Sequence, residues 1–195
     1  MSTLGQLAFD GDEDALRQRF AAGASPNDPA EFMQGFPVLC IAAQLGHVNV
    51  MRVLLEAGAS LEATRSQTGA NALLMAAHNG HVECAEALLK GGANPEATNN
   101  NGFTALLKAA QNGHASCVEA LLKRGANPEA TEPKWGATSL IQAAFAGQPE
   151  SIRALLQGGA KLEATGKTRG TALHAAAQEG CAGCVEALVK GGANP

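Results

Sequence analysis

A Gly-Ala dipeptide followed by Ser, Asn or Lys occurs six times in this 195-residue chain. The six copies start at Gly23, Gly58, Gly92, Gly125, Gly159 and Gly192. Consecutive copies lie 35, 34, 33, 34 and 33 residues apart. A period that persists from end to end is typical of one structural unit copied and stacked, in which each copy packs on its neighbours. The sequence therefore predicts a repeat array rather than a globule with a single core, and such an array favours binding over catalysis.

The repeated unit is clearest over residues 102–127. Thr104 supplies a side-chain oxygen that can cap the start of a helix. Gly113 and Gly125 each end a helix, because glycine adopts the left-handed C-terminal conformation at little cost. Between these signals the apolar residues recur at helical spacing, at Leu106, Ala109, Ala110, Val118, Leu121 and Leu122. Each repeat is therefore expected to be a pair of short helices.

These motifs resemble the ankyrin-repeat family, whose Thr-Pro-Leu-His, paired alanines, Gly-His, Val-x-x-Leu-Leu and Gly-Ala-Asn recur over essentially the whole chain. Residues 171–174, Thr-Ala-Leu-His, are the nearest copy of the opening tetrapeptide. The resemblance implies an all-α repeat solenoid of stacked helix–loop–helix repeats with β-hairpin-like finger loops and a concave partner-binding surface. A degenerate N-terminal capping repeat is expected at 3–28, and the full repeats are expected at 31–64, 65–98, 99–131, 132–165 and 166–195.

The two ends of the array are expected to differ. Arg19 stands where later copies have leucine, and several acidic residues lie at the start of the second helix. Both features are expected of a terminal repeat with a polar outer face. The last copy keeps the internal apolar pattern at Cys184, Val185, Leu188 and Val189. Its outer face is therefore predicted to be uncapped and available to further repeats or to self-association.

Composition and charge exclude several classes of function. The net charge of −4 argues against a nucleic-acid partner, which needs a basic face. No apolar stretch approaches the length of a membrane span, and the start of the chain has no signal-peptide pattern. The five cysteines are odd in number and lie mostly on predicted helices, which favours a reducing compartment, cytoplasmic or nuclear.

Cys181 and Cys184 form a Cys-x-x-Cys motif, the spacing of redox pairs and of half a zinc site. Cys184 occupies the repeat position of Cys84 and Cys117, where a small apolar filler at a helix start is the favoured interpretation. Only Cys181 is extra, and no second motif completes a metal site. Packing is therefore preferred, and a metal- or redox-sensing scaffold using Cys181 and Cys184 remains the alternative.

Other chemical-looking patterns follow the repeat. Histidines at 47, 81 and 114 share one position after a helix-ending glycine, which indicates a loop-stabilising role. Glutamates at 62, 96, 129 and 163 recur in a Glu-Ala-Thr phrase, for which hairpin hydrogen bonding is favoured over a cation site. Residues 166–168 imitate the end of a phosphate-binding loop, but Lys161 stands where its first glycine is required. No catalytic residue, metal or cofactor is predicted.

The residues that break the repeat are the best candidates for binding a partner. In the family, the finger tip, the residue after the finger glycine and the two residues before the helix-ending glycine face the partner. In this sequence those positions include Phe103, Trp135, Phe145, His78, Asn101, Asn112, Phe32, Met33, Phe36 and Leu45. Exposed aromatic residues mark interaction sites. The prediction is a non-enzymatic protein–protein interaction scaffold that binds a peptide or protein on its concave finger and inner-helix face.

Two groups of these candidates are treated differently. Phe103, Trp135 and Phe145 are predicted to form one partly exposed patch over adjacent repeats, flanked by polar side chains at 78, 101 and 112. For Phe32, Met33 and Phe36, packing onto the first finger is an equally good interpretation.

Overall fold

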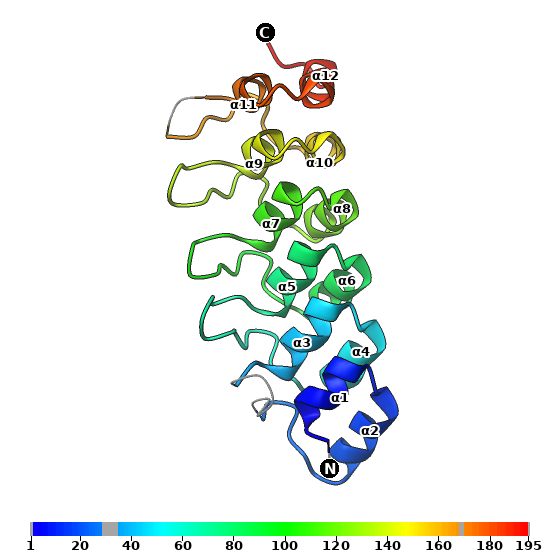
Figure 1. Cartoon of the computed structure of the whole chain (residues 1–195). Helices are drawn as coiled ribbons and strands as arrows, with labels where there is room; N and C mark the ends of the chain where they lie inside the picture. Colours follow the sequence, from blue (N-terminus) through cyan, green and yellow to red (C-terminus); the bar gives the residue numbers. More distant parts are fainter. Residues whose placement is uncertain (1, 29–34, 168–169, 195) are drawn as a thin grey trace. The chain divides into compact units, whose positions relative to one another are not determined.

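A computed structural model describes residues 2–28, 35–167 and 170–194 (Figure 1). The chain forms two compact units, Met1–Asn94 and Pro95–Pro195. The helices of the first unit are α1 (Leu4–Asp10), α2 (Glu13–Ala21), α3 (Val38–Leu45), α4 (Val48–Glu56), α5 (Ala72–Asn79) and α6 (Val82–Lys90). Those of the second unit are α7 (Ala105–Gln111), α8 (Ala115–Lys123), α9 (Ser139–Phe145), α10 (Pro149–Gln157), α11 (Ala172–Gln178) and α12 (Ala182–Lys190).

Within each unit the helices stack in two rows. In the first unit α3 packs between α1 and α5, and α4 packs between α2 and α6. In the second unit α9 packs between α7 and α11, and α10 packs between α8 and α12. The long loops of the second unit extend on the side of α7, α9 and α11, which are therefore the inner helices (Figure 1). The described residues contain no strand, Thr131 and Thr138 form an isolated antiparallel bridge, and the all-α repeat fold is confirmed.

The helix ends form as the local sequence predicts. Thr104 Oγ1 accepts a hydrogen bond from the Leu107 amide at 3.3 Å, which caps α7. Gly46 follows α3 with a φ of 75°. A Cβ at this position would also lie 2.6 Å from His81 Nδ1, so both the backbone and the neighbouring ring require glycine.

The core of each unit is built from alanine and leucine. Outer-row helices α4, α6, α8, α10 and α12 each contribute a fully buried leucine at the equivalent position: Leu54, Leu88, Leu121, Leu155 and Leu188. The paired alanines of the inner helices, such as Ala109 and Ala110, are also fully buried, so neighbouring helices approach closely. Arg19 takes the equivalent place in α2, where it is half-buried and donates a hydrogen bond to the Ser2 carbonyl at 3.0 Å.

The repeated glutamates join successive loops. Glu62 Oε1 accepts the amide of Asn94 at 3.0 Å, within the first unit. In the second unit the carboxylates of Glu96, Glu129 and Glu163 accept the amides of residues 127, 161 and 194 at 2.8, 2.8 and 3.3 Å. The hairpin hydrogen-bonding role predicted for this position is confirmed.

Two of the repeated histidines connect adjacent helix pairs. The ring nitrogen Nε2 of His47 lies 3.1 Å from the Phe9 carbonyl, and that of His81 lies 3.1 Å from the Gln44 carbonyl. The loop-stabilising role predicted for these two residues is confirmed. His174 Nδ1 lies 2.9 Å from Thr171 Oγ1 and forms the capping box of α11, a structural role as well.

Candidate interaction site on the second unit

Trp135 and Phe145 are the two most exposed aromatic side chains among the described residues, with 54% and 44% of their surface accessible. Trp135 lies in the finger loop before α9, and Phe145 is the last residue of that helix. Both rings line one pocket of about 480 Å³, together with Ala137, Gln142 and Gln178. The pocket is therefore apolar on two sides and presents side-chain amides from α9 and α11.

A smaller cavity of about 70 Å³ shares Trp135 and Phe145 with the main pocket and extends toward the start of α11. His174 and Thr171 contribute to its lining. The capping box at the start of α11 orients the His174 ring. The residues on this side of the cavity are therefore positioned by a helix rather than by a loop. The fifth and sixth helix pairs, α9–α10 and α11–α12, thus both contribute to one site.

Glu132 organises the finger that carries Trp135. Its side chain is buried, and its Oε1 accepts the amides of Trp135 and Ala137 at 2.8 and 3.1 Å. Its Oε2 accepts the amide of Lys134 at 2.7 Å. Three backbone donors therefore compensate one buried carboxylate, since hydrogen bonds to the charged form stabilise it.

The role of Glu132 was missed by the sequence prediction. A signal was present, because Asn99 occupies the same place in the preceding finger. Asn99 Oδ1 accepts the amides of Asn101 and Phe103, both at 3.0 Å. A hydrogen-bond acceptor side chain at the start of the finger thus recurs in these two repeats, and it sets the conformation of the residues that follow it.

The next finger rests against the one that carries Trp135. The Lys167 amide donates to the Trp135 carbonyl at 2.7 Å, and Lys167 Nζ donates to the Pro133 carbonyl. A Cβ at Gly166 would lie 2.9 Å from the Trp135 carbonyl oxygen, so glycine is needed for this approach. The backbone at Trp135 is therefore fixed both by Glu132 and by the following finger.

Lysine ammonium groups lie near two of the rings on this unit. Lys134 Nζ is 5.0 Å from the Trp135 ring centroid, and Lys108 Nζ is 3.9 Å from that of Phe103. Both are cation–π contacts. Lys108 also donates to Gln111 Oε1 at 3.1 Å, and its partial burial lowers its pKa.

The structure brings together part of the predicted patch. Trp135 and Phe145 line the same pocket, whereas Phe103 is not among its lining residues and is half-buried under Lys108. Asn101 is exposed on the Phe103 finger, and Asn112 is the half-buried C-cap of α7. The three-ring patch is therefore reduced to a two-ring pocket.

The remaining candidates belong to the first unit. His78 and Leu45 are exposed near the ends of α5 and α3. Phe36 is 4% exposed, and the Arg65 guanidinium lies 5.0 Å from its ring centroid, so the structure corrects its assignment as a partner contact. For this residue the packing interpretation holds, because its ring is covered by neighbouring residues. Phe32 and Met33 lie outside the described residues.

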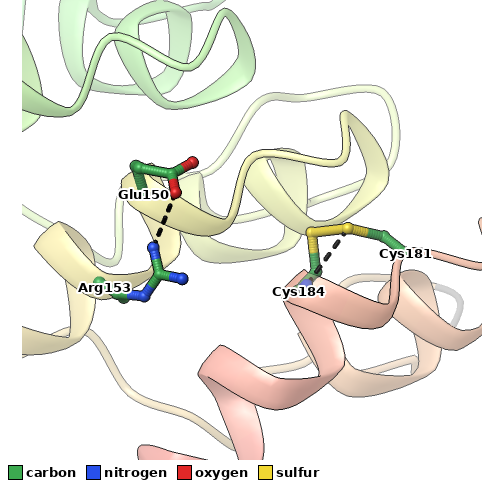
Figure 2. Close-up of a disulfide and its surroundings, with 4 residues drawn as sticks. All are labelled: Glu150, Arg153, Cys181 and Cys184. Atoms are coloured by element: carbon green, nitrogen blue, oxygen red, sulfur yellow. Dashed lines mark hydrogen bonds and ion pairs between the residues drawn. A yellow bond between two sulfur atoms is a disulfide. The ribbon is translucent and has the colours of Figure 1, made fainter.

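Cys181 and Cys184 are joined by a disulfide at the start of α12 (Figure 2). Cys184 is fully buried, as predicted for a small apolar residue that packs at a helix start, but the prediction did not include its disulfide bond. The Cα atoms of the two cysteines lie 5.3 Å apart, which is within the range found for disulfide-bonded cysteines. Cys181 Sγ also accepts the Cys184 amide at 3.2 Å. The other cysteines, Cys40, Cys84 and Cys117, are buried and are not joined in disulfides.

In the described part of the chain, no group of three or more His, Cys, Asp or Glu residues is arranged to hold a metal ion. Among those same residues, no helix has both the length and the apolar character needed to cross a membrane.

The stacked helix pairs and the finger loops define a helical repeat protein. The family model for ankyrin repeats matches the chain at residues 4–99, 39–132 and 125–195. These matches span nearly the whole sequence, and the chain belongs to the ankyrin-repeat family. No curated protein matches the chain. Ankyrin repeats are generally protein–protein interaction modules.

Proposed function

We propose that this chain is a non-enzymatic scaffold that binds a peptide or protein segment through the fingers and inner helices of its repeats. The pocket between Trp135 and Phe145 is the anchor site. The observation that carries the proposal is that two large aromatic rings are about half exposed and line the same pocket. Exposed aromatic residues beside a pocket are the side chains that dominate binding energy at protein interfaces.

The surroundings of the pocket support this role. Glu132 and Lys167 fix the backbone at Trp135, so the finger does not need to be ordered when a partner binds. A preorganised site keeps more of the contact energy as affinity. Gln142 and Gln178 supply amide donors and acceptors that can orient the backbone of a bound segment.

The alternative of a metal- or redox-sensing scaffold gains no support from membership of the family. Zinc titration of the reduced chain against a Cys181→Ala variant separates the two functions. A stoichiometric zinc site that disappears in the variant would favour the alternative. Equal and weak zinc binding by both proteins would favour the scaffold.

The direct test is a peptide-display selection on the intact chain, followed by affinity measurements on the enriched peptides. Trp135→Ala is expected to weaken these peptides by about 2 kcal/mol, roughly 30-fold, because the indole is the main anchor. Val189→Ala is the matched control, since Val189 is also an exposed apolar residue, 48% accessible, but lies on α12 outside the pocket. Equal affinities for the wild-type chain and both variants would refute the anchor site.

Trp135 also provides an internal readout. It is the only tryptophan and the chain has no tyrosine, so emission excited at the indole band reports on this residue alone. In the free protein the indole should be quenched by acrylamide, and a bound peptide should protect it. An enriched peptide that leaves the quenching unchanged would bind elsewhere on the chain.

A further inference from the structure

In the described tip segments 132–136 and 166–167 of two successive fingers the exposed charges are positive, whereas the exposed carboxylates of Glu96 and Glu163 lie earlier in their loops and accept amides of the following repeat. Lys134 and Lys167 are exposed at the tips of two successive fingers. The acidic residue in these segments is Glu132, which is buried with its carboxylate accepting three backbone amides. These two lysines give the Trp135 side of the pocket a basic rim, whereas Glu179, next to the pocket-lining Gln178, is an exposed acidic residue and the whole chain has a net charge of −4.

Each of the two exposed lysines makes a contact on the finger that carries Trp135. Lys134 Nζ lies 5.0 Å from the Trp135 ring centroid, and Lys167 Nζ donates to the Pro133 carbonyl. Both ammonium groups are thus held on the finger that carries the anchor ring. A carboxylate that approached this finger would gain charge-assisted hydrogen bonds without first having to order the two lysines.

We infer that the preferred partner is an acidic peptide segment with one large apolar side chain, which enters the Trp135–Phe145 pocket while neighbouring carboxylates pair with Lys134 and Lys167. This inference rests on the proposed function and names the chemistry of the partner at the same site. The apolar residue provides most of the affinity, and the charges provide register and selectivity, since charges at the rim of an interface mainly set specificity and association rate.

The same contacts disfavour a cationic partner. An aromatic pocket can also recognise an ammonium group over the face of its rings. Here the Lys134 ammonium already lies near the Trp135 ring, and Lys167 adds a second positive charge on the adjacent finger. A basic peptide would meet like charges at the point where its anchor enters.

The net charge of the chain makes salt dependence a sensitive test. If the overall charge of −4 governed the encounter, salt would strengthen binding of an acidic peptide by screening repulsion. If the basic rim governs it, salt would weaken binding. We expect weakening between 50 and 500 mM NaCl, because the Debye length shortens from more than about 10 Å to a few ångströms over that range.

The first experiment uses a random peptide library displayed against the intact wild-type chain, with the Trp135→Ala chain as the counter-selection. The expected result is that Trp135-dependent peptides are enriched in Asp or Glu within a few residues of a Leu, Phe or Trp. Trp135-dependent peptides without acidic enrichment, or enriched in Lys or Arg, would overturn this inference and leave the proposed function standing. Peptides that bind both chains equally, or the absence of any enriched peptide, would overturn both.

The second experiment measures an enriched acidic peptide against two double variants of equal charge change. Lys134→Met with Lys167→Met removes both rim charges but keeps the length of the side chains, and we expect about tenfold weaker binding and loss of the salt dependence. Lys123→Met with Lys190→Met changes exposed lysines on α8 and α12 and controls for net charge. Thermal melts establish that both variants are folded. Equal affinities of the two double variants would overturn the inference.

Discussion

The backbone amide of Trp135 donates a 2.8 Å hydrogen bond to Oε1 of Glu132, three residues earlier in the same finger. The same oxygen accepts the amide of Ala137, which also lines the pocket. The conformation that exposes the indole is therefore set by a carboxylate that is itself hidden from solvent. This relationship makes Glu132 a positioning residue for the anchor.

Glu132→Ala should leave three backbone amides without their acceptor and lower the free energy of unfolding by about 1–3 kcal/mol. The finger should also lose its fixed conformation, so peptide affinity and the acrylamide quenching of Trp135 should both change. Glu132→Gln is the matched variant, because it keeps one acceptor oxygen but places an amide donor against the remaining backbone donors. We expect its free energy of unfolding, measured by chemical denaturation, to lie between those of the wild type and Glu132→Ala. An alanine variant with wild-type stability and quenching would contradict this role.

Leu121→Ala should destabilise the second unit strongly. Leu121 is fully buried on α8, and removal of a buried leucine side chain costs about 2–5 kcal/mol through lost contacts and a residual cavity. Since coupling in repeat proteins is between nearest neighbours, urea unfolding should then show more than one transition. Leu45→Ala, at an exposed leucine, is the control and should change stability by less than about 1 kcal/mol. Similar losses for both variants would argue against the packing described for α8.

Alkaline pH should destabilise the first unit through its buried thiols. Burial raises the pKa of Cys40 to about 12, and burial with a contribution from the Glu83 carboxylate raises that of Cys84 to about 11. An unfolded thiol titrates near about 8.5, so above that pH the unfolded chain releases protons that the folded chain retains. Stability is thus fully present below about pH 8.5 and falls by about 1.4 kcal/mol per pH unit for each thiol as pH rises toward 11.

The measurement for the buried thiols is urea unfolding at pH 8, 9 and 10. Cys84→Ala should reduce the slope of stability against pH by about half, and Cys40→Ala with Cys84→Ala should remove most of it. A double variant that keeps the wild-type slope would show that other groups govern the alkaline loss.

Reduction of the Cys181–Cys184 disulfide should lower stability only modestly. The two cysteines are three positions apart in the sequence, and for so short a loop the chain-entropy model gives about 2 kcal/mol. Melting temperatures with and without a phosphine reductant should differ by a few degrees for the wild type. Cys181→Ala should melt at the same temperature in both conditions. A reductant-sensitive Cys181→Ala chain would assign the effect to another group.

The disulfide illustrates one limit of prediction from the sequence. Cys181 stands at the position from which His47 and His81 connect helix pairs, and its short side chain bonds to Cys184 within the same helix start (Figure 2). The repeat register correctly predicted that Cys184 would be buried. It did not predict the bond, because the register describes a position and not the distance between two sulfur atoms.

The aromatic residues show a second limit. Phe36 and Trp135 both occupy finger positions that the family pattern assigns to the partner-facing surface, yet Phe36 is buried and Trp135 is about half exposed. Arg65 lies over the Phe36 ring, whereas the Trp135 finger is held outward by Glu132 and Lys167. Which aromatic side chain is available to a partner depends on contacts with the neighbouring finger.

The sequence by itself determined the period of the array, the helix pairs, the capping of a helix start by Thr104, the left-handed helix end at Gly46 and the hydrogen-bonding role of Glu129. These features are local or recur at a fixed spacing, so each copy predicts the others. The tertiary structure alone decided that Trp135 and Phe145 share a pocket, that Phe103 lies outside it and that Glu132 is buried. The reason is physical: the finger residues do not repeat, and their exposure is set by the side chains that adjacent repeats bring against them.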